Sequence, residues 1–157
     1  MKQHTWKIYA AWILFTEAVG SLSGWLTRDG AKAYSESIIQ PPLSPPALVF
    51  PIVWGILFAL MGIGAARIYL ASPSRDRTNS LRIFLLQLAF NFFWSILFFN
   101  FQAFGAALVW LVILWGLILW MIVSFRKVDP LAAWLQVPYL LWVTFAAYLN
   151  YGVWILN

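Results

Sequence analysis

The sequence contains little charge and no cysteine, and both absences exclude classes of protein. Only 10% of its 157 residues are charged, whereas a soluble globular domain has about 25% charged residues. So few charges cannot cover a water-exposed surface, so lipid must surround most of the chain. Without cysteine no disulfide or thiolate site is possible, and with His4 as the single histidine a His/Cys metal centre is excluded too.

Two common enzyme signatures are also missing. The sequence has no glycine-rich phosphate loop and no Ser-His-Asp set, so a kinase or hydrolase function has no support. The net charge of +5 comes from basic residues in short segments beside apolar runs. That position is typical of topology signals and lipid headgroup contact, not of nucleic-acid binding. No internal repeat is visible, which disfavours a transporter built from inverted repeats.

Apolar side chains are what the sequence has in excess. Hydrophobic residues make up 63% of the chain, and the mean hydropathy is +0.81. They form segments of about 19 residues or more, each long enough to cross ~30 Å of hydrocarbon as a helix. The five segments are residues 8–26, 47–70, 83–101, 103–125 and 131–156. We therefore expect an all-α integral membrane protein, a five-transmembrane-helix bundle that forms a single domain over residues 1–157.

The first apolar segment is expected to remain as a helix. Glu17 interrupts it, and removing it as a signal peptide would leave an even number of spans. Basic residues then fall unequally on the two sides of the bundle. The N-terminal side carries Lys2, Lys7, Arg67, Arg75, Arg77, Arg82, Arg126 and Lys127, and the other side carries Arg28 and Lys32. By the positive-inside rule the N-terminus is cytoplasmic and the C-terminus outside, as expected for a multi-pass protein of a bacterial cell membrane.

An outward loop over residues 27–46 is the longest connection. It ends in QPPLSPPALVFPIVWG, residues 40–55, which holds five of the chain's eight prolines. Pro45 and Pro46 stand where a helix start tolerates missing backbone donors, and Pro51 lies about one turn further in. Because proline stiffens the backbone, we expect this stretch to form the rigid rim of a ligand pocket, with Trp54 as its first wall.

Polar side chains inside the spans are costly and therefore informative. Gln87, Asn91 and Ser95 recur every four residues and share one helix face. Two interpretations remain open for this face, namely hydrogen bonds between helices and contact with a ligand. Glu17 is the one acid within a span, and a structural role is favoured over a proton relay. It shares a face with the GxxxG pair Gly20 and Gly24, which permits close helix packing.

Two further stripes combine aromatic and small residues. Trp54 and Phe58 are followed one turn later by Gly62, and the last segment has a stripe of Tyr139, Trp142, Ala146 and Asn150. Pro138 precedes the second stripe and is expected to bend that helix, which opens space beside it. Core packing or an interfacial belt is the alternative for aromatic residues in membranes. A cavity suits Trp54 and Trp142 better, because both lie several residues inside a span.

Three blocks of sequence resemble one family. PPLSPPALVFPIVWGILFALMGIGAARIY, LAFNFFWSILFF at 88–99 and VPYLLWVTFAAYLNYGVW at 137–154 are similar to the TspO/MBR family. This family comprises the tryptophan-rich sensory proteins, the bacterial branch of the mitochondrial translocator protein or peripheral benzodiazepine receptor. The resemblance covers the whole chain. It implies a five-helix bundle, often a homodimer, that binds porphyrins such as protoporphyrin IX and haem, and in some members cholesterol and isoquinoline or benzodiazepine-type drugs.

The resemblance also implies a set of ligand-binding residues. They are Tyr34, Pro45, Pro46, Trp54, Phe58, Asn91, Trp94, Ser95, Tyr139, Trp142, Ala146 and Leu149. The chain departs from the family pattern where Tyr34-Ser35 replaces Trp-Tyr and where Leu43 replaces a tryptophan. No basic residue follows Tyr151, so the cholesterol motif of the animal proteins is absent, which argues against sterol binding through it.

Three functions are compatible with these residues. The first is a membrane protein that binds porphyrins or haem for tetrapyrrole transport, sensing or stress regulation, with the tetrapyrrole as ligand and no required cofactor or metal. Binding would rest on shape and stacking, since no histidine lies within a span to ligate haem. The second is an enzyme that degrades protoporphyrin IX in light, with Trp54 and Trp142 as catalytic candidates. The third is a structural or accessory membrane subunit.

Overall fold

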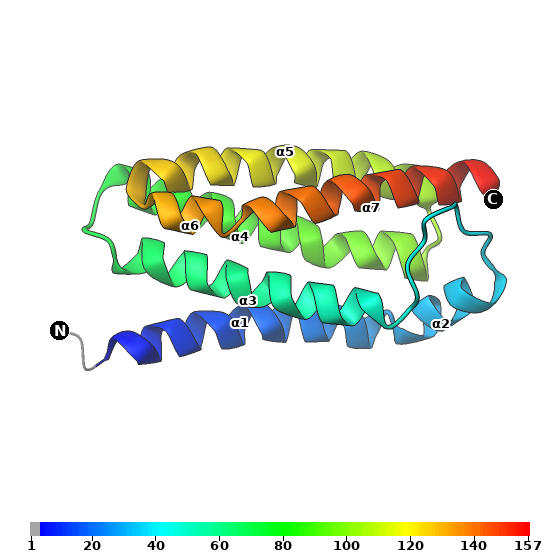
Figure 1. Cartoon of the computed structure of the whole chain (residues 1–157), viewed down its shortest axis with the longest axis horizontal. Coiled ribbons are helices and arrows are strands. Elements are labelled where there is room, and N and C mark those ends of the chain that lie inside the picture. Colours follow the sequence, from blue (N-terminus) through cyan, green and yellow to red (C-terminus); the bar gives the residue numbers. More distant parts are fainter. Residues whose placement is uncertain (1–3) are drawn as a thin grey trace.

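The computed structural model describes residues 4–157, and over this range the chain is helical with no strand. Five long helices lie side by side along one axis (Figure 1). The α-helices are α1 (Thr5–Leu26), α2 (Arg28–Ser37), α3 (Val49–Leu70), α4 (Arg75–Ser95), α5 (Phe104–Val128), α6 (Pro130–Trp134) and α7 (Val137–Leu156). A π-helical turn, η1 (Ile96–Asn100), extends α4. The predicted all-α architecture is therefore confirmed.

Four segments are long and apolar enough to cross a membrane. They are Val49–Leu70, Arg75–Asn100, Phe104–Val128 and Pro130–Leu156. The helix α1 has 22 residues but is not among them, and it carries Lys7 and Glu17 in its sequence. Together with the comparisons below, these segments identify a membrane protein.

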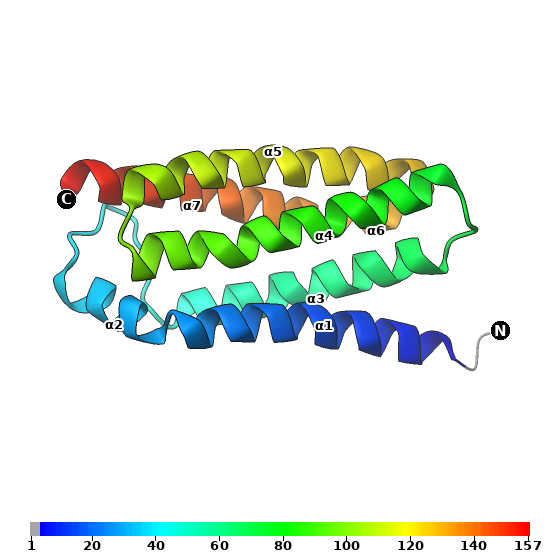
Figure 2. The same cartoon turned by 180° about the vertical axis from the view of Figure 1, so that it is seen from behind.

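The basic residues gather at one end of the bundle. Figure 2 shows the start of α1, the end of α3, the start of α4 and the end of α5 at the same end, with α2 at the other. The first end carries Lys7, Arg67, Arg75, Arg77, Arg82, Arg126 and Lys127, while Arg28 and Lys32 belong to α2. Lys2 lies outside the described residues. The unequal distribution of charge is thus a property of the folded bundle.

The predicted loop over residues 27–46 is wrong in one respect, because α2 occupies much of it. The Ala31 amide donates to the Thr27 carbonyl, 2.8 Å away, and starts this helix directly after α1. Tyr34 packs its ring 5.3 Å from Phe98 and 5.4 Å from Phe99. These contacts with η1 stabilise α2, a helix that its polar composition did not predict.

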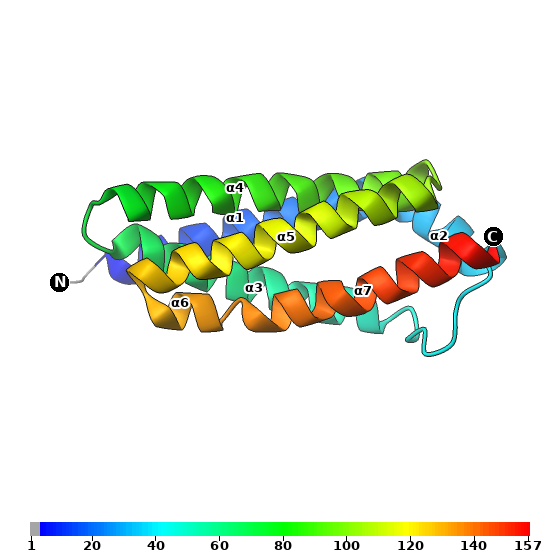
Figure 3. The same ribbon diagram turned by 90° about the horizontal axis from the view of Figure 1, so that it is seen from above.

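The last membrane segment does change direction, as predicted, but at a break just before Pro138 and not within a continuous helix (Figure 3). The last membrane segment is divided into α6 and α7, and Pro138 lies in the first turn of α7. A proline there costs no hydrogen bond, because the first turn of a helix has no internal acceptor for its amides. At the break, the buried Gln136 side chain donates to the Leu60 carbonyl of α3 at 3.1 Å. This bond ties the break between α6 and α7 to α3.

The helices pack most closely where glycine removes a side chain. A Cβ atom on Gly62 would collide with the backbone of Ile13, so α1 and α3 touch at this level. Gly20 likewise lies directly against the ring of Phe58, so one member of the GxxxG pair packs closely as predicted. By contrast, a Cβ atom on Gly24 or Gly55 would meet nothing within 4 Å. The two helices are thus in tight contact at mid-bundle and leave open space nearer α2.

Candidate functional site

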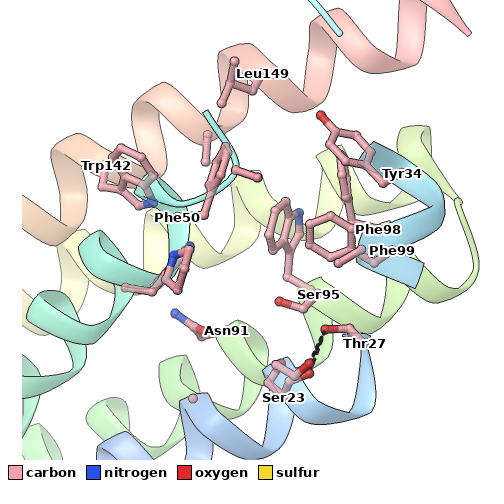
Figure 4. A pocket seen from close by; sticks show the side chains of 18 of the residues that line it. Ser23, Thr27, Tyr34, Phe50, Asn91, Ser95, Phe98, Phe99, Trp142 and Leu149 are labelled. Atoms are coloured by element: carbon pink, nitrogen blue, oxygen red, sulfur yellow. Dashed lines mark hydrogen bonds between the residues drawn. The ribbon is translucent and has the colours of Figure 1, made fainter. Parts of the chain in front are cut away.

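A cavity of about 710 Å³ lies in the half of the bundle that contains α2. Side chains from α1, α2, α3, α4, η1 and α7 line it, together with the proline-rich segment before α3, whereas α5 contributes nothing. Figure 4 shows side chains from these elements pointing toward one another across the space. Its volume falls within the range of about 300–1,000 Å³ that is usual for small-molecule sites.

Eight aromatic side chains line the cavity. On one side Trp54 lies 5.6 Å from Phe58, and Phe50 lies 5.9 Å from Trp142 of α7. On the other side Trp94 stacks on Phe98 at 5.1 Å. The cavity is therefore bounded by flat, polarisable surfaces on α3, α4 and α7, which suits stacking on a planar ligand.

A hydrogen-bonded chain fixes the polar floor. The Asn91 side-chain amide donates to the Tyr139 hydroxyl at 2.7 Å, and that hydroxyl donates to the Gln87 carbonyl oxygen at 2.7 Å. Asn91 lines the cavity, whereas Gln87 and Tyr139 lie behind it, and Tyr139 is 1% exposed. This face therefore bonds helices together, and it also presents Asn91 to the cavity, where contact with a ligand stays a prediction.

A second hydrogen-bonded pair holds Trp94 in place. Its indole N–H donates to the Asn150 carbonyl oxygen at 3.1 Å, and the Asn150 amide donates to the Phe104 carbonyl at 2.8 Å. These bonds tie α4, α7 and α5 together beside the cavity. Trp94 is consequently presented to the space as a fixed face whose N–H is already used.

Trp142 differs from Trp94 in its polar atom. The Trp142 indole nitrogen is buried and has no hydrogen-bond partner within the described chain. The residue lines the cavity, and Figure 4 shows its ring at the wall opposite Tyr34 and Phe99. An unpaired buried donor is unfavourable by about 1–3 kcal/mol, so an acceptor on a bound molecule would relieve this cost.

The α1 side of the cavity is lined by small and polar residues, and the sequence analysis did not predict them as site residues. The buried Ser23 hydroxyl donates to the Phe92 carbonyl at 3.2 Å, and the Thr27 hydroxyl donates to the Ser23 carbonyl at 2.8 Å (Figure 4). Glu17 and Gly24 also line the space. The spacing of Gly20, Gly24 and Thr27 along α1 could have indicated this face, because small and polar residues recur there every three to four positions.

Among the described residues, the one charged residue type that lines the cavity is acidic. Glu17 is the acidic residue among the lining side chains, and no Lys, Arg or His among residues 4–157 lines the space. Tyr34 is the other ionisable lining residue, and burial raises the pKa of its hydroxyl, so this group stays neutral at physiological pH. Uncharged contacts must therefore provide most of the binding energy for any ligand.

The proline-rich segment is tied to the end of α7. The Tyr148 hydroxyl donates to the Pro42 carbonyl at 2.8 Å, and Asn157 exchanges two hydrogen bonds with Ile39, at 3.1 and 2.8 Å. Pro41 packs directly against Gly152, where a Cβ atom would not fit. Pro45 and Pro46 precede α3 and line the cavity. The segment thus forms one rim of the opening, and its first part, from Ile39 to Pro42, is anchored to α7 and Asn157.

The structure places the predicted ligand-binding residues around one space. All of them line the cavity except Tyr139, which supports Asn91 from behind. The catalytic candidates Trp54 and Trp142 both line it. Pro51 belongs to the first turn of α3, where its missing amide is harmless, and not to a deeper turn as predicted. Phe50, Phe98 and Phe99 complete the aromatic wall and were not predicted.

The order of these features along the chain matches a known family. The sequence model of the TspO/MBR family matches residues 12–155 of this chain. The chain belongs to this family. The match includes every element that lines the cavity, from α1 to α7, so the cavity is built by the part of the chain that the family shares.

Named relatives agree with this assignment. The tryptophan-rich protein TspO of Chlorobaculum tepidum is 38% identical over 141 residues, which cover 89% of each chain. The translocator protein of Bos taurus is 33% identical over 151 residues, 95% of this chain and 89% of the relative. The tryptophan-rich sensory protein of Cereibacter sphaeroides is 29% identical over 152 residues, 97% and 92% of the two chains. The TspO/MBR family thus extends over nearly the whole chain.

Proposed function

We propose that this TspO/MBR family member binds a porphyrin or haem in the aromatic cavity and serves tetrapyrrole transport, sensing or stress regulation. The observation that carries the proposal is the cavity of about 710 Å³ whose walls present Trp54, Trp94 and Trp142 from three different helices. Rings on facing walls suit a flat macrocycle better than a flexible chain, because stacking requires parallel or edge-on surfaces. Trp142 and Asn91 supply a few polar contacts, as small-molecule sites usually do.

Charge determines how a tetrapyrrole would be oriented. A porphyrin carries carboxylates, and the lining side chains offer them Glu17 and no basic partner. Burying a carboxylate beside another acid is strongly unfavourable. We therefore infer that the macrocycle enters with its apolar edge first and leaves its carboxylates at the opening near the proline-rich rim.

Metal ligation is not expected to contribute to affinity. The one histidine, His4, precedes α1, and the sequence has no cysteine. Haem and metal-free protoporphyrin IX should therefore bind with similar affinity, by shape and stacking. A haem complex with the spectrum of histidine ligation that persists in His4→Ala would contradict this inference.

The membrane arrangement belongs to the same proposal. We infer five spans, because α1 has 22 residues, about 33 Å of helix, and packs against α3 at Gly62. The basic end of the bundle then faces the cytoplasm by the positive-inside rule, and the cavity opens on the outer side of a bacterial cell membrane. Cysteine introduced at Lys7 and at Glu36 and labelled from outside would test this, since we expect labelling at position 36 alone.

The decisive experiment is a porphyrin titration followed by tryptophan fluorescence. Wild-type protein should show saturable quenching at micromolar protoporphyrin IX. Trp142→Ala and Asn91→Ala should weaken binding about tenfold or more, which corresponds to about 1.4 kcal/mol. Trp134→Ala is the matched control, because Trp134 is 70% exposed and lies outside the cavity. Unsaturable quenching in the wild type would instead favour a structural or accessory subunit.

Light-dependent degradation of the porphyrin is the second candidate. It is favoured by the position of Trp54, which lines the cavity and whose ring lies 6.2 Å from the oxidisable ring of Tyr139 behind the wall. Under illumination with dioxygen as oxidant, wild-type protein would convert protoporphyrin IX to a defined product. Trp54→Phe and Trp142→Phe would retain binding but lose that product. Pigment that stays unchanged in the wild type would leave binding as the function.

A further inference from the structure

A second cavity, of about 350 Å³, lies between α4 and α5. It is lined from the first part of α4 and the last part of α5, which lie at the end of the bundle opposite α2 (Figure 2). It shares no residue with the aromatic cavity. We call it the α4–α5 groove, and it is lined by Asp76, Asn79, Arg82, Ile83, Trp120, Val123, Ser124 and Lys127. On each helix these residues recur every three or four positions, so each set forms one continuous face.

A hydrogen bond between α4 and α5 shows how far each lining residue lies from the end of the bundle. The buried Ser80 and Ser124 hydroxyls lie 2.6 Å apart and fix the register of α4 against α5. The two helices are antiparallel, as Figure 3 shows from above. Lys127 and Asp76 therefore lie near the end of the bundle, while Arg82 and Trp120 lie one to two turns deeper. The groove is polar at its outer end and aromatic at its inner end.

The two cations in the groove have no partner of their own. Within residues 4–157 neither Arg82 nor Lys127 forms a hydrogen bond or an ion pair. Two other basic residues at this end are engaged, since Arg67 pairs with Asp129 at 2.6 Å and Arg77 donates to the Tyr69 carbonyl. Within residues 4–157 Arg75 and Arg126 also lack a hydrogen bond or ion pair, but they lie outside the groove. With Asp76 the lining side chains carry a net charge of +1, and the Asn79 amide adds neutral donors. This combination favours a singly charged anion.

The inner end of the groove continues as an apolar surface. Trp120 is 56% exposed and Val123 is 52% exposed. One turn deeper on the same faces lie the exposed residues Leu86 and Gly116, and a Cβ atom on Gly116 would meet nothing within 4 Å. An anion bound at Arg82 would thus lie beside an exposed apolar surface. A free phosphate has no apolar part that could contact this surface.

We propose that the α4–α5 groove binds one anionic phospholipid. The phosphodiester lies between Arg82 and Lys127, hydroxyl groups of the headgroup reach Asn79 and Asp76, and an acyl chain follows Trp120 toward Gly116. Arg and Lys near a membrane boundary extend their charged ends toward the headgroups while their stems stay in the apolar region. Basic pockets between transmembrane helices hold anionic headgroups by the same chemistry. This site is separate from the proposed tetrapyrrole cavity.

Native mass spectrometry of the detergent-purified full chain tests the proposal. Phosphatidylglycerol should remain bound one per chain, and phosphatidylcholine of the same acyl chains should bind much more weakly. The double variant Arg82→Gln with Lys127→Gln should weaken phosphatidylglycerol binding about 25-fold, from about fivefold for each basic residue. Trp120→Ala should also weaken it, because the acyl chain loses its contact.

Two controls distinguish this site from less specific effects. Arg75→Gln with Arg126→Gln removes the same charge from the same end without touching the groove, and it should change binding less than twofold. Porphyrin titration of each double variant verifies that it is folded. The proposal is overturned if the control pair loses as much affinity, if phosphatidylcholine binds equally well, or if inorganic phosphate binds as tightly as the lipid.

Discussion

Side chains fill the interior in the half of the bundle that contains the start of α1, whereas the half that contains α2 encloses a cavity. In the first half Met61, Ile68 and Phe84 have no exposed surface. In the second half Gly24 and Gly55 face open space, and Trp142 keeps an unpaired indole N–H. Both halves consist mainly of apolar and aromatic residues, so composition does not distinguish them. The difference lies in whether each small residue has a large neighbour to fill the space beside it.

This comparison separates stability from binding. Between membrane helices there is little hydrophobic driving force, and close packing supplies much of the stability. The filled half therefore stabilises the bundle, and the open half can keep unsatisfied groups for a ligand. Substitutions in the two halves should affect different measurements, and the following predictions run from the largest effect to the smallest.

Phe84→Ala should cause the largest loss of stability. The Phe84 ring meets Trp12 edge-on at 5.8 Å and stacks near Phe125 at 6.3 Å, with no exposed surface. Truncation leaves a void that the neighbours only partly fill, so the free energy of unfolding should fall by about 3 kcal/mol. Denaturant unfolding in detergent would measure it. Phe93→Ala, at a residue 49% exposed, is the matched control and should cost less than about 1 kcal/mol.

Tyr139→Phe tests the boundary between the two halves. The change removes a hydroxyl that accepts from Asn91 and donates to Gln87, so two buried amides lose a partner. Stability should fall by about 2 kcal/mol, and porphyrin affinity should fall as well because Asn91 is no longer oriented. Unfolding and fluorescence titration of one preparation would show both effects. The control Tyr151→Phe, at a residue 50% exposed, should alter neither stability nor porphyrin affinity. If Tyr139→Phe lowers stability but leaves porphyrin affinity unchanged, Asn91 makes no ligand contact.

Pro45→Ala with Pro46→Ala should loosen the rim of the open half. Each replacement increases the conformational freedom of the segment before α3 by about 0.4–1 kcal/mol, which ligand binding must then oppose. Porphyrin affinity should fall about fivefold, while the amount of inserted protein stays unchanged. Pro73→Ala, in the connection at the opposite end, is the control. Equal losses of insertion and affinity in the double variant would refute a specific role for the rim.

Glu17→Gln should have the smallest effect and the opposite sign. Removing the one acid that lines the cavity removes repulsion toward the carboxylates of protoporphyrin IX. Affinity for the diacid should rise about threefold, or about 0.6 kcal/mol, and affinity for its dimethyl ester should not change. Glu36→Gln removes the same charge from α2, outside the cavity, as a control. An equal gain for the ester would show that Glu17 acts on packing and not on charge.

Local patterns predicted the helices well where apolar runs were continuous. The second and fourth segments, expected at 47–70 and 103–125, appear as Val49–Leu70 and Phe104–Val128. The third was expected from residue 83 but begins at Arg75, because the Ser74 hydroxyl accepts from the Arg77 amide and caps the helix before the apolar run. Such polar helical turns carry no hydropathy signal. The same reason explains why α2 was missed.

The candidate site was predictable from the resemblance and less so from spacing. Spacing placed Gln87, Asn91 and Ser95 on one face but could not reveal which of them reaches the cavity. That outcome depends on Tyr139, whose hydroxyl inserts between the two amides from α7. The contribution of α1, including Glu17, depends on how α1 packs against α3. Contacts between helices distant in sequence decided these points, and no local pattern encodes them.

The π-helical turn at Ile96–Asn100 has an evolutionary consequence. A π-helical turn accommodates one more residue than an α-helical turn, so it amounts to a one-residue insertion into the helix. Here it coincides with Phe98 and Phe99 beside the cavity. A relative with one residue fewer at this point would return to α-helical winding and rotate the following side chains by about 100°. Its ligand preference could then change while every neighbouring residue in its sequence stayed the same.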